Sequence, residues 1–170
     1  PATRQWSPSP PAGWRNTVGC PPEERAWLQD LLQENRSHER LPVVVFTHHT
    51  LVGYRPLPPP MVRAGLGYRT AQPVDSAAML GLLEPDPCVR AVFSGHAHFQ
   101  QVRAVRGLVH VQGAAMAEGA MSFLRVLVFA DHLEVETYQP IGAAYLRQSG
   151  RPTGTWVIGY PEDINTRIDL

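Results

Sequence analysis

Two short apolar runs, each followed directly by histidines, constrain this chain more than any other feature of its sequence. The runs are 43–46, with the sequence Val-Val-Val-Phe, and 89–94, with the sequence Val-Arg-Ala-Val-Phe-Ser. Short runs of mainly apolar residues are typical of strands whose two faces are both covered by other layers. The histidines that follow them are His48 and His49 after the first run, and His96 and His98 after the second. The two runs therefore predict buried strands of an α/β fold with imidazoles at their ends.

Helical and alternating patterns surround these two runs. A helix is expected over about 23–35, after two prolines and with two glutamates in its first turn, and a second helix over about 75–83. Beyond residue 100 the apolar period changes to two, which predicts antiparallel hairpins. The strands expected for them are 101–105 with 108–111, and 122–129 with 133–138. The pattern is that of an α/β chain with two βα-type units followed by antiparallel hairpins.

Three segments lack such patterns. Residues 1–22 are expected to form an irregular arm, because prolines interrupt them repeatedly. Residues 50–73 contain further prolines and glycines and predict a long loop, of the kind that is usually functional or mobile. Residues 140–170 are expected to be a C-terminal extension, with an edge strand as one possibility for 155–160 and a tail for the remainder.

Composition excludes several classes of protein. The 170 residues are enough for one domain or a large part of one, and 44% of them are hydrophobic, too many for a disordered chain. The formal net charge is zero, so bulk charge draws the chain neither to nucleic acid nor to an anionic membrane. No apolar run approaches the roughly 20 residues of a membrane span. The compartment stays open, with the cytoplasm favoured.

The histidines predict a metal site. Ligands collect at the carboxyl ends of strands in open α/β sheets, and His48 and His96 both follow such strands. If the strands are neighbours, the two imidazoles can share an ion, and imidazole suits zinc, iron or manganese. His98 lies two residues further on and could serve a second ion, whereas His49 is expected around the ligands or facing substrate. Gly95 is expected to let the backbone leave the strand sharply. The remaining histidines are expected to be structural: His38, His110 and His132.

These stretches together resemble a known family. The helix from Pro22 to Leu28, the strand ending in Thr47-His48-His49, the helix 79–83 and the segment 89–98 resemble the second half of calcineurin-like metallophosphoesterases. The resemblance covers roughly residues 21–139, so 23–139 would be the C-terminal portion of such a domain. It implies part of a four-layer α/β/β/α sandwich and two metal ions (Mn, Fe or Zn). By this likeness His48 and His96 belong to one metal, His98 belongs to the other, and the reaction is hydrolysis of a phosphomonoester or phosphodiester.

The departures from the family pattern are equally informative. The first half of the family supplies Asp-x-His, Gly-Asp-x-x-Asp and Gly-Asn-His motifs, and none of them occurs here. No catalytic acid is identifiable in this chain. Three neutral imidazoles cannot hold two divalent ions about 3.5–4 Å apart, because nothing offsets the repulsion between the ions. We therefore expect this chain to supply only the histidine-rich half of a site and to be inactive alone.

Two explanations of the missing motifs remain. The chain is either the C-terminal part of a longer phosphoesterase, which its start without methionine and its proline-rich arm favour, or a degenerate or stand-alone half whose remaining ligands come from another subunit or not at all. The expected partners are then a phosphate-ester substrate and the missing N-terminal half or that subunit. The alternative function is a non-enzymatic interaction or scaffold module. The long loop offers arginines that could contact substrate phosphate: Arg55, Arg63 and Arg69.

Overall fold

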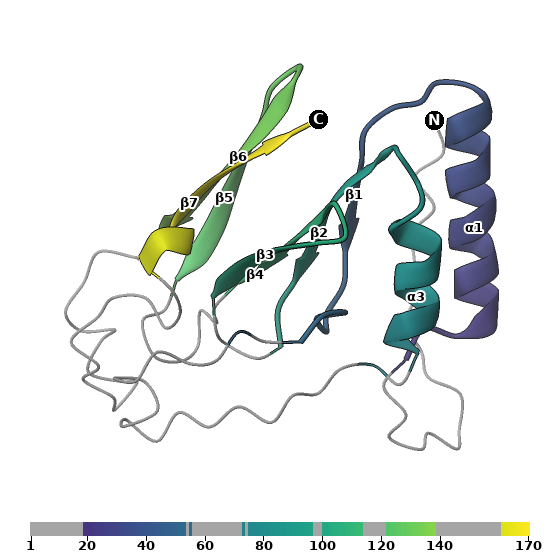
Figure 1. The fold of residues 1–170 in the computed structure, drawn as a ribbon, viewed down its shortest axis with the longest axis horizontal. Helices are drawn as coiled ribbons and strands as arrows, with labels where there is room; N and C mark the ends of the chain where they lie inside the picture. The colour runs from purple at the N-terminus through teal and green to yellow at the C-terminus, as the bar shows by residue number, and fades with distance from the viewer. Residues whose placement is uncertain are drawn as a thin grey trace.

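A computed structural model describes residues 19–53, 55, 73, 75–96, 100–113, 122–138 and 161–170. Within them the chain forms two α-helices, one short 3-10 helix, a four-stranded sheet and a three-stranded sheet (Figure 1). The elements in chain order are α1 Pro22–Ser37, β1 Val43–Phe46, α3 Ser76–Leu83, β2 Val89–Ser94, β3 Gln101–Val105, β4 Leu108–Gln112, β5 Phe123–Val128, β6 His132–Tyr138, η1 Pro161–Asp163 and β7 Asn165–Asp169. The predicted mixed α/β class and both predicted hairpins are confirmed.

The described elements stack in three layers (Figure 1). Helices α1 and α3 cover one face of the four-stranded sheet, where Leu32, Leu83 and Val92 belong to one buried cluster. The three-stranded sheet covers the opposite face, where Phe93 and Val135 belong to a second cluster. The order is thus helices, sheet, sheet, and burial on both faces fixes the four-stranded sheet in the middle of the fold.

Helix α1 spans Pro22–Ser37, one residue longer at its start and two residues longer at its end than the predicted 23–35. Pro22 occupies the first turn, where its missing N–H costs no hydrogen bond, and Glu23 and Glu24 lie at the positive end of the helix dipole. Arg25 then joins this helix to the start of α3, because its Nη1 donates to the Asp75 carboxylate at 2.8 Å. The two helices are therefore held together at one end by an ion pair as well as by the apolar cluster.

The four-stranded sheet has the order β1-β2-β4-β3. Strands β1, β2 and β4 run parallel, and β3 runs antiparallel to β4 at the other edge. We expected residues 43–46 to be covered on both faces, but β1 is an edge strand whose Phe46 is 73% exposed. Phe46 lies beyond the cover of the second sheet, with its ring stacked on Phe93 at 5.2 Å. β2 lies inside the sheet, paired with β1 on one side and with β4 on the other.

The second sheet has the order β5-β6-β7. Strand β7 corrects the expectation of a C-terminal tail, because Asn165–Asp169 pair antiparallel with β6 and Ile168 is buried between the sheets. This strand was not predicted because most of its residues are polar, and only alternate side chains of a strand need to face the core. The proposed edge strand 155–160 lies outside the described residues.

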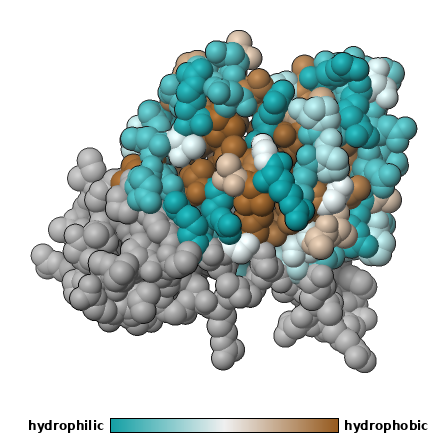
Figure 2. Space-filling model, in the orientation of Figure 1, coloured by the Kyte–Doolittle hydropathy of each residue, from teal (hydrophilic) through white to brown (hydrophobic). Residues whose placement is uncertain are grey.

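The outer face of the second sheet carries ion pairs beside partly exposed aromatic rings in the described part of the chain. Arg125 pairs there with Glu136 at 2.7 Å, and Arg167 lies 3.2 Å from Asp169. No described helix covers this face, so the fourth layer of the expected sandwich stays a prediction. Figure 2 shows apolar atoms gathered between the strands of the two sheets and framed by hydrophilic ones. Among the described helices, none is long and apolar enough to cross a membrane.

Candidate metal centre

The pairing of β1 with β2 brings the two histidine segments together. The strands are parallel and adjacent, so both chains leave the sheet at the same edge. The ladder continues past the strand ends, where the Thr47 N–H donates to the Phe93 carbonyl at 2.8 Å and the Gly95 N–H to the His48 carbonyl at 3.0 Å. These backbone bonds fix the separation of the two segments, because they tie residues just before the histidines to each other.

Three imidazole rings meet at this edge. His48 Nε2 lies 3.1 Å from His96 Nδ1, and the ring centroids of His49 and His96 are 4.0 Å apart. Nitrogen atoms of all three rings lie within 4.8 Å of one another. Two imidazoles bound to one tetrahedral zinc ion at about 2.0–2.1 Å have nitrogens about 3.3 Å apart. The His48 and His96 nitrogens therefore lie near the separation that a shared ion requires. Without a metal, the same two nitrogens are joined by a hydrogen bond.

The backbone at His96 is unusual. Its φ is +67°, in the left-handed region that residues other than glycine seldom adopt. We expected the sharp turn at Gly95, but an added Cβ there would meet only the His48 carbonyl oxygen, at an ordinary 3.8 Å. Left-handed backbone costs roughly 1–3 kcal/mol and persists where the surroundings impose it, often at functional sites. The strain at this turn therefore lies on the histidine itself.

Electrostatics favour the neutral, ligand form of His49. Burial lowers the pKa of His49, and the neighbouring His96 and His48 lower it further, since a second positive charge beside them is unfavourable. Only the neutral imidazole offers a lone pair to a metal. The sequence placed His49 outside the ligand set, but its ring nitrogens lie among those of the cluster. The chain bends directly after β1, and the bend brings both consecutive rings into the cluster, which no local sequence pattern indicates.

The cluster fits one divalent cation better than two. Among the described residues, the group within coordinating reach contains His48, His49 and His96 and no carboxylate. Three neutral ligands leave the fourth position of a tetrahedral ion open, as in catalytic rather than structural sites. A second cation close by would need anionic ligands to offset repulsion. The described residues of this cluster thus offer only neutral ligands to a cation.

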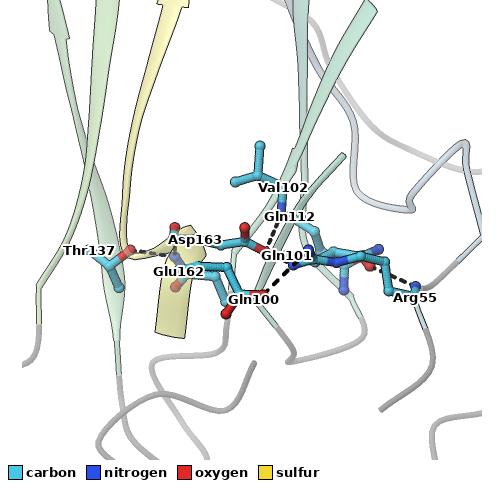
Figure 3. Close-up of polar contacts among 8 residues, drawn as sticks. All are labelled: Arg55, Gln100, Gln101, Val102, Gln112, Thr137, Glu162 and Asp163. Atoms are coloured by element: carbon cyan, nitrogen blue, oxygen red, sulfur yellow. Dashed lines mark hydrogen bonds and ion pairs between the residues drawn. The ribbon is translucent and has the colours of Figure 1, made fainter. Parts of the chain in front are cut away.

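The other predicted site residues divide into two groups. His98, Arg63 and Arg69 lie outside the described residues. Arg55, expected to contact substrate phosphate, instead directs its guanidinium to the Asp163 carboxylate and, at 3.7 Å, to Glu162 (Figure 3). The sequence could not reveal this pair, because more than a hundred residues separate its members.

The histidines expected to be structural are all described. His38 follows the last turn of α1 and is exposed, and His132 stacks on Phe129 at 4.4 Å while bonding Asp131 at 2.6 Å. His110 lies in β4 and is 4% exposed, and its Nε2 has no hydrogen-bond partner among the described residues. None of these three belongs to the cluster at the strand ends.

The buried His110 predicts a pH-dependent stability. Burial lowers its pKa to about 4, with Arg103 acting in the same direction and Glu84 against it. The unfolded chain therefore binds a proton below about pH 6.5 that the folded chain takes up only near pH 4. Stability should fall as the pH drops through this window, by up to about 3 kcal/mol at about 1.4 kcal/mol per pKa unit. Urea unfolding between pH 4 and 8 should show a flatter dependence for His110→Gln. The exposed-site variant His38→Gln should follow wild type, and a His110→Gln curve parallel to wild type would contradict the assignment.

Comparison with known proteins finds one similar fold among solved structures. No protein-family model matches the chain, and no curated protein matches it. Among solved structures, the chain is similar to a dimetal phosphatase from Danio rerio, with a TM-score of 0.55 and 16% sequence identity over 71% of this chain. The chain spans 36% of the length of that phosphatase. Over most of its length, then, the chain has a fold similar to part of a dimetal phosphatase and carries a histidine cluster where its parallel strands end.

Proposed function

We propose that this chain supplies the histidine side of a metal centre that hydrolyses a phosphomonoester or phosphodiester. His48, His49 and His96 would hold one divalent cation, with manganese, iron and zinc all compatible with imidazole ligands. The remaining ligands, including the carboxylates that a second cation requires, would come from another stretch of polypeptide. His98 stays a proposed ligand of that second cation, and Arg63 and Arg69 stay proposed contacts for substrate phosphate.

The observation that carries this proposal is the meeting of three ring nitrogens at the carboxyl ends of two parallel strands. A pair of histidines joined only for stability would be satisfied by one hydrogen bond, and the third ring would not be needed. The left-handed backbone of His96 also supports the proposal, because strain of this kind is found mainly at functional sites.

In this proposed centre, the residues of the chain would bind the cation and hold the imidazole rings in place. The ladder bonds beyond β1 and β2 hold the rings at fixed separation, so little reorganisation is needed on binding. The lowered pKa of His49 keeps its lone pair available at neutral pH. When bound, a divalent cation supplies Lewis-acid polarisation of a phosphoryl oxygen and lowers the pKa of a coordinated water.

The edge position of β1 supports a polypeptide partner. Among the described strands none pairs with the outer edge of β1, and Phe46 on that strand is 73% exposed. An unpaired edge beside an exposed aromatic ring is a typical place for another strand to add. A strand added along β1 would end beside His48, where an acidic ligand is needed. The partner would be an N-terminal half of the same protein or another subunit.

The direct test is metal analysis and turnover on one sample of the purified chain. Equilibrium dialysis against Mn²⁺ or Zn²⁺ should give one weakly held ion per chain, removable with a chelator, and aryl phosphodiesters with added manganese should show no turnover. No bound ion would favour the non-enzymatic scaffold function. Two ions per chain with robust turnover would show that the chain carries its own acidic ligands and would contradict the half-site.

A further inference from the structure

The segment that follows His48 and His49 is held by side chains from distant parts of the chain. Its first residues, Thr50, Leu51 and Val52, are all nearly inaccessible to solvent. The Gly53 carbonyl then accepts a hydrogen bond from Arg103 Nη1, and the Arg55 N–H donates to Gln101 Oε1 at 3.0 Å. Both partners belong to β3. The downstream end of the histidine turn is therefore fastened at several points, just as β1 fastens its upstream end.

Asp163 is the junction of this fastening (Figure 3). Its Oδ2 accepts the Val102 N–H at 2.9 Å and also pairs with Arg55 Nη2. Its backbone carbonyl accepts Gln100 Nε2 at 2.8 Å. Asp163 lies in η1, just before β7, and is 8% exposed. Through this residue, η1 contacts the segment that follows His48 and His49.

The ion pair between Asp163 and Arg55 is buried enough to hold the backbone near Arg55 in place. The side chain of Asp163 is 9% exposed and that of Arg55 is 30% exposed, so water screens the pair only partly. Removing one partner of such a pair leaves the other with a desolvated and unmatched charge, which is costly. Glu162 also approaches Arg55, but at 3.7 Å and with 62% of its side chain exposed. Exposed pairs of this geometry contribute little, so the hold on Arg55 rests on Asp163.

We propose that Asp163 is a positioning residue for the metal centre, which holds the His48–His49 turn in its ligating geometry through Arg55. This proposal rests on the proposed function, since it assigns a role toward the same cluster. Asp163 is not one of the candidate ligands. Its effect would pass through Arg55 and through the buried residues Thr50, Leu51 and Val52, which follow the histidines.

The test compares Asp163→Asn with Glu162→Gln by hydrogen exchange and by Co²⁺ binding. Asparagine keeps an acceptor for the Val102 N–H but loses the charge that holds Arg55. We expect amides of residues 50–53 and 55 to exchange at least about tenfold faster in Asp163→Asn, with β5 and β6 unchanged. Co²⁺ affinity should fall about tenfold, as is typical when residues that support ligands are lost. Glu162→Gln should match wild type in both measurements.

A second variant keeps the proposal testable if Asp163→Asn folds poorly. Arg55→Gln removes the same contact from the loop side and should accelerate exchange of the same amides. The double variant should show no more acceleration than either single one, because both remove one interaction. Additive effects, exchange at 50–55 equal to wild type, or equal acceleration in β5 and β6 would each overturn the proposal.

Failure of the two proposals can be told apart. If wild type binds no Co²⁺, the proposed function fails, and with it the role toward a metal. Exchange at residues 50–55 then still shows whether Asp163 holds the turn. If wild type binds Co²⁺ and Asp163→Asn binds it equally well, the positioning role fails while the metal centre stands.

Discussion

Replacement of His96 by alanine is expected to abolish metal binding by this chain. His96 contributes the ring whose Nδ1 lies 3.1 Å from His48 Nε2, and it also lies closest to the ring of His49. The loss should be at least about 100-fold in affinity, since even residues that only orient ligands are worth about 10- to 100-fold. Titration with Zn²⁺ by calorimetry measures it directly. In a full-length protein that contains the remaining ligands, metal-dependent phosphatase activity should disappear as well.

Two further variants separate loss of the ligand from damage to the backbone. His96→Asn keeps a side chain that tolerates left-handed backbone, so it should fold like wild type and still fail to bind the ion. His38→Ala removes an exposed histidine at the end of α1 and should leave affinity unchanged. Wild-type affinity or turnover in His96→Ala would reject this residue as a ligand.

Replacement of Leu83 by alanine is expected to have the largest effect on stability. Leu83 is the last residue of α3, its side chain is 0% exposed, and it belongs to the cluster between the helices and the four-stranded sheet. Truncation of a buried leucine costs about 3 kcal/mol, through lost burial and the cavity that remains. That is a large share of the roughly 5–15 kcal/mol by which domains are stable. Urea unfolding, with the midpoint shifted and the slope kept, gives the measurement.

Leu31→Ala is the matched control for this truncation. Leu31 lies on α1 with 44% of its surface exposed, so the same change should cost less than about 1 kcal/mol. Equal destabilisation by the two variants would show that the helix layer does not depend on the cluster around Leu83.

Local pattern was enough to predict the elements that carry the histidines. Val43–Phe46 and Gln101–Val105 were predicted with their observed bounds, and the other predicted helices and strands differ from the observed ones by one or two residues at their ends. The convergence of His48 with His96 followed from one physical rule, that parallel neighbours end at a common edge. The sequence could not predict the tertiary pairings: Ile168 is the one apolar residue of β7, and the place of this strand in a sheet depends on β6 lying beside it.

Two contacts of the predicted site residues could not be read from the sequence for the same reason. His49 was placed outside the ligand set because His48 lies closer to the strand, and the structure puts its ring centroid 4.0 Å from that of His96. Arg55 looked like a phosphate contact because it stands in a proline-rich loop, yet its charge is matched by Asp163 from the opposite end of the chain. Neither contact has a local sequence signature, since both depend on how separate segments pack.

The two edge strands of the four-stranded sheet, β1 and β3, differ in how their outward backbone groups are bonded. At β3, the Val102 N–H that points away from the sheet is already bonded by Asp163, so this border is closed by a side chain. At β1, no described strand or described side-chain bond occupies the outward row. Among the described strands, the edge at which the sheet could accept a further strand is therefore that of β1. Growth at that edge would lengthen the row of strand ends on which His48 and His96 stand, so that assembly and completion of a ligand set would be a single event.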